Sequence, residues 1–433
     1  MSKTLYTNGT QHTPFPRGPL PVGCKDVCTE GEDAVLFRMF FPVLGKKVPY
    51  EEQDPASWTD WYLGQPYSTG FAKFIITTQS YSMWILRALS PFLFLYGDWL
   101  TKSLKVPTAW LGGEQPDEDN AARETPAGAK MPVLVASHGM AAHRSVFSCL
   151  ASDLASHGFL VLVLEHRLRN DPKFFVRERR KLAEPNASCS PCASRDGSSC
   201  ASFHVGPASS RSWMIYSGYE RESQLDRRVE EVFGAVAAVR RLNDGTLINE
   251  LEPDHKLSAF KGALDVNNMA LLGHSYGGTT TLRVLADPRN CFKVGVTLDP
   301  WMFPVRADPE ALGRAVAIPV LSVSSEDFNQ GANLKALRRL RDAHKTEESM
   351  FYTMKGTTHH HGNDAPWLAG RLGWWITSGN YTHPPEIINE LQNNLILTFL
   401  DKYLDIEDRR LLASVIPVYE QFIQENKGIL LED

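Results

Sequence analysis

The sequence has no excess of basic residues, because 45 lysines and arginines are outnumbered by 50 aspartates and glutamates. The resulting net charge of −5 offers no basic surface for a phosphate backbone, so we expect no nucleic-acid partner. An apolar stretch typical of a secretory signal is also lacking near Met1. Ser2 stands where myristoylation requires glycine, and the last residues form neither a retention signal nor a prenylation box. These absences predict a cytoplasmic protein.

Cysteine is scarce, with seven residues in a chain of 433. An odd count without a secretory signal favours reduced thiols over a disulfide framework. Cys189, Cys192 and Cys200 lie together in a serine-rich segment, but they lack the second C-x-x-C pair of a typical zinc site. We expect no metal and no cofactor, and the role of this cysteine group stays open.

The sequence also lacks an uninterrupted apolar run of roughly 20 residues, the length that a membrane-spanning helix needs. Residues 71–100 come nearest and are rich in aromatic side chains, but Arg87, Pro91 and Asp98 interrupt them. Two alternatives remain for this stretch: helices packed on a core, or a helix lying in the membrane interface with its aromatic side chains inserted. The pattern alone favours buried helices.

Apolar strand-like segments that alternate with helical segments make up most of the chain. Strands are expected over residues 34–42 and near residues 132, 159, 269, 294, 318 and 350, and helices over residues 219–242 and 385–403. Alternating strands and helices build parallel sheets, so we predict one doubly wound α/β domain. Residues 1–32 are expected to form an irregular N-terminal arm, and residues 112–130 and 183–211 are expected to be surface insertions.

The segment Asn267–Ala286 carries the strongest chemical signal. Met269–Leu272 is a short apolar run, Gly273–Gly277 is a G-x-S-x-G pentapeptide around Ser275, and residues 279–286 continue without proline or glycine. Strand, tight turn and helix together are typical of a nucleophile elbow, in which glycines leave room for a strained turn. This context predicts a nucleophilic Ser275 rather than a serine in an ordinary glycine turn.

Two later strands end in the side chains that a serine nucleophile needs. Asp299 ends the strand near residue 294, and His359–His361 follow the strand near residue 350. Serine, aspartate and histidine in this chain order are typical of the α/β-hydrolase fold, whose sites lie at the carboxyl ends of the strands. The imidazole takes the serine proton, and the carboxylate holds the imidazole in the required tautomer.

The pattern leaves alternatives for two of these roles. Glu326 and Asp327, after the following strand, compete with Asp299 for the role of the carboxylate. Position alone does not separate His359 from the two histidines that follow it. Three consecutive histidines also raise the question of a metal, but consecutive side chains point in different directions, and no second cluster at ligand spacing accompanies them.

An oxyanion hole needs two backbone N–H donors close to the nucleophile. The residue after the serine, Tyr276, is placed to supply one. Ser137–Met140 follow the strand near residue 132 and fit the loop that supplies the other, with the Met140 N–H as donor. We predict that the Met140 and Tyr276 N–H groups lie near Ser275 and form the oxyanion hole.

Two sequence signatures resemble those of the platelet-activating-factor acetylhydrolases, which comprise plasma and type II intracellular enzymes. They are Gly273–Gly278 (G-H-S-Y-G-G) and Leu298–Pro304 (L-D-P-W-M-F-P). Ala136–Met140 and Lys355–His359 add to the similarity, which runs from about residue 22 to residue 403. The resemblance implies an α/β-hydrolase fold and calcium-independent hydrolysis of the short or oxidised sn-2 acyl ester of phospholipids such as platelet-activating factor.

The resemblance also implies roles for individual residues. Ser275 would be the nucleophile, Asp299 the orienting carboxylate and His359 the general base, with Met140 and Tyr276 as oxyanion donors. Trp301 would lie near the acyl pocket. His360 departs from the family pattern, and it would line the substrate pocket and change its shape. Peripheral contact with a lipid surface would involve Trp84, Leu89, Trp367, Leu368, Trp374 and Trp375.

Two other functions remain as alternatives to a phospholipid acyl hydrolase. One is a broader carboxylesterase or lipase that acts on neutral esters. The other is a non-catalytic lipid-binding protein of the same fold, against which the intact serine, aspartate and histidine argue. The range of sn-2 chain lengths, the physiological substrate and the oligomeric state are not encoded in any motif that we recognise.

Overall fold

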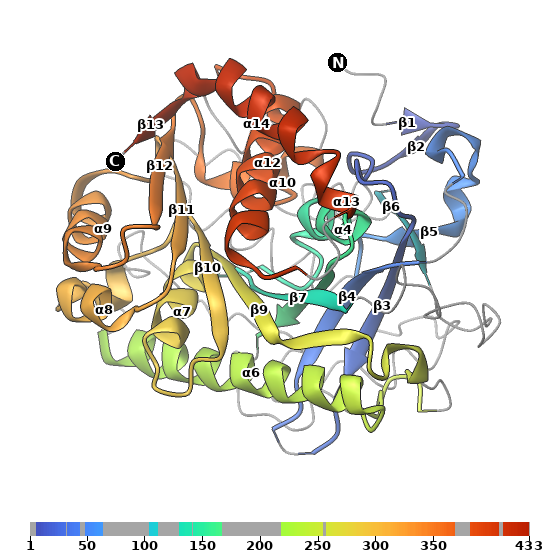
Figure 1. Ribbon diagram of the computed structural model, residues 1–433, viewed down its shortest axis with the longest axis horizontal. Coiled ribbons are helices and arrows are strands. Elements are labelled where there is room, and N and C mark those ends of the chain that lie inside the picture. Colours follow the sequence, from blue (N-terminus) through green and yellow to red (C-terminus); the bar gives the residue numbers. More distant parts are fainter. Residues whose placement is uncertain are drawn as a thin grey trace, which may run out of the picture.

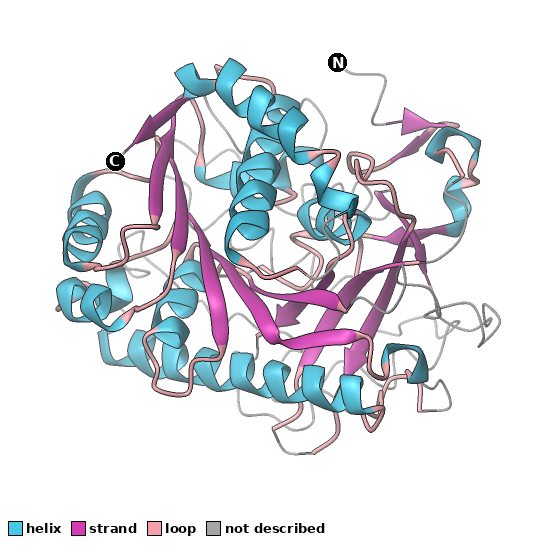
Figure 2. Ribbon diagram, in the orientation of Figure 1, coloured by secondary structure: helices cyan, strands magenta, loops and turns pink. Residues whose placement is uncertain are grey.

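The structure is a computed structural model that describes residues 6–31, 33–43, 48–63, 104–110, 130–140, 142–166, 218–253, 257–368, 382–406 and 410–432. Its centre is an 11-stranded sheet in the order β13-β12-β11-β10-β9-β7-β8-β4-β3-β6-β5, with helices on both faces (Figures 1 and 2). A separate two-stranded hairpin, β1 (Tyr6–Thr7) and β2 (Thr10–Gln11), lies near the N-terminus.

Six neighbouring strands in the middle of the sheet are mutually parallel, as predicted. They are β12 (Met350–Met354), β11 (Val320–Ser325), β10 (Phe292–Leu298), β9 (Leu264–His274), β7 (Met131–Ser137) and β8 (Leu160–Glu165). The flanking strands are β13 (Leu430–Glu432), β4 (Leu36–Pro42), β3 (Val22–Cys28), β6 (Lys105–Trp110) and β5 (Trp58–Asp60). β13 and β4 each run antiparallel to the neighbouring strand of this parallel set. The carboxyl ends of the six parallel strands therefore meet along one edge.

Helices cover the two faces of this sheet. On one face lie α4 (Ser148–Ser156), α12 (Pro385–Tyr403) and α14 (Ile416–Glu425), and on the other α6 (Gly218–Asp244) and α7 (Tyr276–Leu285). The remaining helices are α8 (Pro309–Ala315), α9 (Gly331–Ala343), α10 (Ala365–Leu368) and α13 (Arg410–Ala413). The predicted helices over residues 219–242 and 385–403 are thus confirmed.

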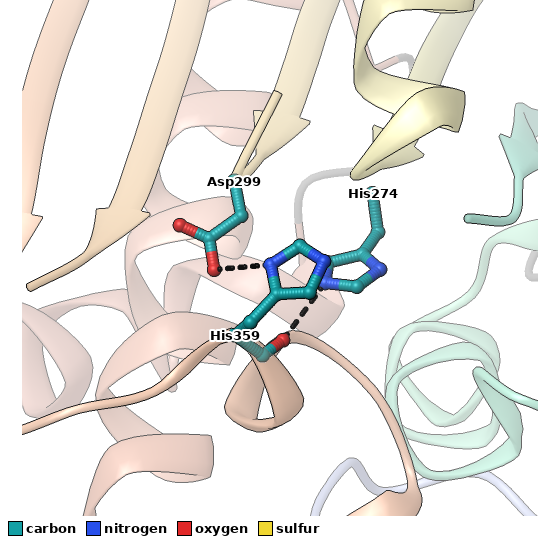
Figure 3. A group of neighbouring side chains, drawn as sticks. All are labelled: His274, Asp299 and His359. Carbon is teal, nitrogen blue, oxygen red and sulfur yellow. Dashed lines mark hydrogen bonds and ion pairs between the residues drawn. The ribbon is translucent and has the colours of Figure 1, made fainter. Parts of the chain in front are cut away.

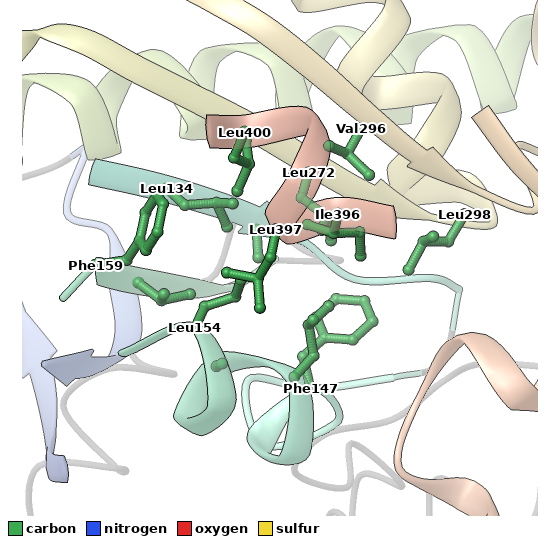
Figure 4. Packing of buried hydrophobic residues seen from close by; sticks show 14 of the residues in the cluster. Leu134, Phe147, Leu154, Phe159, Leu272, Val296, Leu298, Ile396, Leu397 and Leu400 are labelled. Carbon is green, nitrogen blue, oxygen red and sulfur yellow. The ribbon is translucent and has the colours of Figure 1, made fainter. Parts of the chain in front are cut away.

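Side-chain alternation along the central strands divides the apolar core into two layers. In β7, Val133 and Val135 pack in the layer under α6, whereas Leu134 and Ala136 pack in the layer under α4 and α12. Figure 4 shows the second layer, to which Leu134 of β7 and Leu397 of α12 both belong. Period-two alternation of buried apolar residues is what a sheet covered on both faces requires.

The predicted irregular arm over residues 1–32 is wrong for its last part, because Val22–Cys28 form the buried strand β3. Two charged residues in this strand make its sequence look like that of an exposed segment. Lys25 is ion-paired with Glu252, and the Asp26 carboxylate is 2.7 Å from Arg38 Nε and 3.0 Å from Arg144 Nη2. Paired charges are tolerated inside a protein, whereas the sequence pattern alone suggests a solvated loop. The predicted insertions lie outside the described residues, apart from Lys130.

Candidate active site

Ser275 occupies the sharp turn between β9 and α7. Its backbone angles, φ 58° and ψ −119°, lie in a region that a non-glycine residue rarely adopts. Two hydrogen bonds hold it there: the Ser275 N–H donates to the Leu298 carbonyl at 2.8 Å, and the Trp301 N–H donates to the Ser275 carbonyl at 2.9 Å. The strand after the serine, β10, therefore fixes the strained turn, as expected of a nucleophile elbow.

The glycines of the elbow are required by close backbone contacts. A Cβ at Gly273 would lie 2.1 Å from the Gly277 carbonyl oxygen, and a Cβ at Gly277 would lie 1.9 Å from the Ser137 carbonyl oxygen. Both separations are far below any van der Waals contact. The strand, the helix and the loop after β7 thus meet without space for a side chain.

The structure brings Ser275, His359 and Asp299 together at the carboxyl edge of the sheet. His359 Nε2 lies 3.0 Å from Ser275 Oγ. On the other side of the ring, His359 Nδ1 lies 3.1 Å from Asp299 Oδ2, as Figure 3 shows. Because an ionised carboxylate only accepts hydrogen bonds, Nδ1 carries the hydrogen, and Nε2 is free to accept the serine proton. With this geometry the imidazole would take the serine proton and the carboxylate would stabilise the resulting imidazolium, as in a serine, histidine and aspartate triad.

Asp299 is held as a carboxylate by its surroundings. Its side chain is buried and accepts hydrogen bonds from the Ser325 N–H at 2.5 Å and from Ser325 Oγ at 2.6 Å. Burial acts to raise the pKa of the Asp299 carboxyl, but the hydrogen bond and charge of His359, together with His274 and Ser325, outweigh burial and lower it. The group that faces His359 is therefore negatively charged at neutral pH.

The two carboxylates that compete with Asp299 bind the backbone of the histidine loop instead. Asp327 Oδ1 accepts a hydrogen bond from the His359 backbone N–H at 2.9 Å. Glu326 Oε2 accepts one from the Gly356 N–H at 2.7 Å. These contacts place the loop, and only Asp299 among the three carboxylates is hydrogen-bonded to the imidazole in the part of the chain that the structure describes.

Two aromatic rings hold the His359 imidazole between them. Phe328 stacks on it at a centroid distance of 3.9 Å, and His274 stacks at 4.5 Å. His274 Nε2 also donates a hydrogen bond to the His359 carbonyl oxygen at 3.0 Å. Neither ring was predicted to act at the site, although His274 lies inside the G-x-S-x-G pentapeptide. Together they leave the imidazole little freedom to turn away from Ser275.

The other histidines of the triple run point elsewhere. His361 is buried and folds back on its own turn, where Nδ1 accepts a hydrogen bond from the Thr358 N–H at 2.9 Å. His360 is half-buried beside His359, with ring centroids 6.2 Å apart. A short 3₁₀ turn, His359–Gly362, directs each of the three side chains differently.

Activity is expected to rise with pH through a single protonation step. Burial lowers the pKa of His274 to about 3 and those of His360 and His361 to about 4, so all three are neutral near pH 7. These three imidazoles therefore add no protonation step of their own between about pH 5 and 9. The acid limb of kcat/KM should therefore fall about tenfold per pH unit. A limb of slope two, measured between about pH 5 and 9, would contradict this.

His274, Asp299 and His359 also form a cluster whose potential ligand atoms lie within 4.8 Å of one another. The hydrogen bonds of this cluster are already assigned, however. His274 Nε2 donates to the His359 carbonyl, and His359 Nδ1 donates to Asp299. A metal ion would have to displace these hydrogens, so the chemistry of the cluster fits proton transfer better than metal binding.

The loop after β7 lies directly against Ser275. A Cβ at Gly139 would be 3.1 Å from Ser275 Cβ and 3.2 Å from His274 Nδ1. Met140 follows in this loop, and Tyr276 begins α7 on the other side of the serine. The two predicted oxyanion donors thus belong to segments that meet at Ser275.

Trp301 and its neighbours form an aromatic surface beside the elbow. Trp301 is half-buried, its ring packs edge-on to Tyr276 at 5.6 Å, and Phe303 stacks on it at 5.3 Å. The hydrogen bond from the Trp301 N–H to the Ser275 carbonyl keeps this surface next to Ser275. Its position is compatible with the predicted contact with an acyl chain.

The predicted lipid-facing role of Trp367 is wrong for this conformation, because its side chain is only 2% exposed. The Gln11 side chain donates a hydrogen bond to the Trp367 carbonyl at 2.8 Å, which ties the N-terminal hairpin to α10. Trp84, Leu89, Trp374, Trp375 and the Leu368 side chain lie outside the described part of the chain, so their role stays a prediction. None of the described helices is long and apolar enough to span a membrane, and residues 71–100 fall outside them.

The chain is similar to known proteins over nearly its whole length. Residues 5–411 match the profile of the family described as platelet-activating factor acetylhydrolase, isoform II. The platelet-activating factor acetylhydrolase of Cavia porcellus is 28% identical over 92% of this chain and 79% of its own length. That of Gallus gallus is 27% identical over 91% of this chain and 84% of its own length.

A solved structure extends the comparison to the fold. A ferulic acid esterase from Streptomyces cinnamoneus superposes with a TM-score of 0.52 at 14% identity, over 91% of this chain and 93% of its own. At this identity the likeness concerns the fold alone, and it supports the α/β-hydrolase architecture. The profile match, in contrast, spans nearly the whole chain. The chain belongs to the platelet-activating factor acetylhydrolase, isoform II, family of carboxylic ester hydrolases.

Proposed function

We propose that this protein is a calcium-independent serine hydrolase that cleaves the short or oxidised sn-2 acyl ester of phospholipids such as platelet-activating factor. The observation that carries the proposal is the hydrogen-bonded series Ser275, His359 and Asp299 at the carboxyl edge of the sheet. Family membership adds the substrate class, since the relatives in Cavia porcellus and Gallus gallus are named for platelet-activating factor.

The first half of the reaction transfers the acyl group to the protein. Ser275 Oγ attacks the sn-2 carbonyl carbon while its proton passes to His359 Nε2, and Asp299 stabilises the imidazolium that forms. The tetrahedral intermediate carries its negative charge on the former carbonyl oxygen. As the intermediate collapses, the bond from the carbonyl carbon to the glycerol oxygen breaks. His359 then gives the proton to that oxygen, and the lyso-phospholipid leaves.

The second half releases the acid. Water attacks the acyl ester on Ser275 while His359 takes its proton, and the collapse returns that proton to Ser275 Oγ. The backbone N–H groups of Met140 and Tyr276 stabilise the oxyanion in both halves. Proton transfer by an imidazole and charge stabilisation by N–H donors supply the roles that calcium plays in metal-assisted ester hydrolysis.

Hydrolysis of phosphatidylcholines with graded sn-2 chains tests the proposal. We expect an acetyl chain to react with a kcat/KM at least about tenfold above that of a hexadecanoyl chain. A calcium chelator should leave both rates unchanged. Loss of activity with the chelator would contradict calcium independence. Faster hydrolysis of a neutral triglyceride than of the acetyl phospholipid would favour the broader lipase instead.

A further inference from the structure

A buried arginine of α6 contacts the loop after β7, which lies beside Ser275. Arg228 is only 3% exposed. Its Nη1–H donates to the His138 carbonyl oxygen at 2.6 Å, and its Nη2 lies 3.4 Å from the Gly139 carbonyl oxygen. The same guanidinium stacks over the Tyr276 ring, 4.6 Å from its centroid. One side chain therefore touches both segments that flank the proposed oxyanion hole.

These contacts set the direction of the next N–H groups along the loop. In a trans peptide, the carbonyl oxygen and the N–H of the same unit point to opposite sides, and the described residues contain no cis peptide. The Gly139 carbonyl accepts hydrogen bonds from Arg228 Nη2 at 3.4 Å and from His138 Nδ1 at 2.7 Å, and a carbonyl directed toward Arg228 turns the Met140 N–H away from α6. Fixing the His138 carbonyl does the same for the Gly139 N–H. Both N–H groups therefore point to the side of the loop away from Arg228. The backbone at Gly139 also lies against Ser275.

A chain of hydrogen bonds holds the same loop from its side. His138 Nε2 accepts the His166 backbone N–H at 3.2 Å, so His138 Nδ1 carries a hydrogen and donates it to the Gly139 carbonyl at 2.7 Å. His166 in turn lies between Ser137 Oγ at 2.8 Å and Glu231 Oε2 at 2.7 Å. Ser137 is fully buried and cannot reach a substrate. This second series of serine, histidine and carboxylate therefore supports the loop and supplies no nucleophile.

We propose that Arg228 is a positioning residue that aims the Met140 N–H at the oxyanion formed on Ser275. The inference rests on the proposed serine-hydrolase function. A planar guanidinium suits this role, because its fixed fork of donors reaches two neighbouring carbonyls and its flat face packs on an aromatic ring. Neither feature is available to lysine. Burying a cation costs free energy, which a purely structural position could avoid with an apolar side chain.

The proposal predicts an effect on the transition state and not on substrate binding. A misdirected Met140 N–H weakens stabilisation of the tetrahedral oxyanion, whereas the neutral substrate carbonyl gains little from it. Losing one oxyanion donor typically lowers kcat by about 10²- to 10³-fold. KM and the affinity for carbonyl-free analogues should change little.

The test compares Arg228→Met, Arg228→Lys and the control Arg240→Met, which alters an exposed arginine of the same helix. Rates on the acetyl phospholipid are expressed per active site titrated with a fluorophosphonate. Two inhibitors are measured with each variant. One is a trifluoromethyl ketone analogue of the substrate, which forms a tetrahedral adduct with the serine. The other is an ether analogue that has no carbonyl.

For Arg228→Met we expect kcat to fall about 10²-fold. The ketone should bind more weakly by a similar factor, while the ether changes by less than about twofold. The kcat and ketone affinity of Arg228→Lys should lie between those of Arg228→Met and the wild type, and those of Arg240→Met should match the wild type. Unchanged kcat, or equal weakening of both inhibitors, would overturn the positioning role. If Arg228→Met does not fold, Arg228→Lys replaces it in the test: weaker binding of the ketone alone supports the positioning role, and equal weakening of ketone and ether overturns it. Failure of the fluorophosphonate to label Ser275 of the wild type would instead overturn the proposed function and the inference with it.

Discussion

Replacing Ser275 with alanine is expected to lower kcat by about 10⁶-fold, the loss seen when a serine nucleophile is removed from a triad that acts as a unit. The reason is structural. Ser275 Oγ is held 3.0 Å from His359 Nε2 by a strained turn whose neighbours leave no space for adjustment. No other hydroxyl among the described residues is hydrogen-bonded to His359 Nε2. Hydrolysis of the acetyl phospholipid at saturating substrate measures the effect.

A serine on the surface provides the matched control. Ser258 is exposed in a 3₁₀ turn before β9, and Ser258→Ala should retain full activity. Ser275→Ala should also fold normally, because the substitution removes one oxygen and leaves the elbow glycines intact. Undiminished turnover by a folded Ser275→Ala protein would remove this residue from the mechanism.

Replacing Asp299 with asparagine is expected to lower kcat by about 10⁴-fold, as in other triads in which the carboxylate becomes an amide. The asparagine oxygen can still accept the Ser325 N–H, so the strand geometry is preserved. The amide nitrogen, however, donates toward His359 Nδ1 and favours the tautomer that carries its hydrogen on Nε2. That tautomer cannot accept the proton of Ser275.

Asp327→Asn separates the two candidate carboxylates. Asp327 accepts the His359 backbone N–H, and the oxygen of an asparagine can do the same. We therefore expect Asp327→Asn to lose less than about tenfold in kcat, against about 10⁴-fold for Asp299→Asn. If the larger loss belonged to Asp327→Asn, the orienting role would have to be reassigned.

The fold was predictable where local patterns suffice. The six parallel strands are short apolar runs, and their alternation with helices is visible in the chain. β3 was missed because its charged residues resemble a loop until their partners are known. Those partners, Arg38, Arg144 and Glu252, are distant in sequence. Pairings of this kind are set by tertiary contacts, which periodicity does not encode.

Some residues of the site could likewise be predicted from the sequence, and others could not. Ser275 and Asp299 end apolar strands, so their place at the carboxyl edge follows from the sequence. The selection of His359 over its two neighbours depends on the direction of side chains in a 3₁₀ turn and on the stacking of Phe328. Arg228 gave no signal, because a charged residue in a long helix is usually solvated. The lipid-contact role of Trp367 was implied by the family resemblance, and the burial of its side chain contradicts that role.

Mapping the site of covalent labelling by a fluorophosphonate tests the central claim most directly. Such probes phosphonylate an activated serine, and peptide mass spectrometry locates the adduct. We predict one adduct per chain, on Ser275, with loss of phospholipid hydrolysis in proportion to labelling and protection by excess acetyl phospholipid. An adduct on another residue that abolishes activity, or full activity after complete labelling of Ser275, would contradict the account.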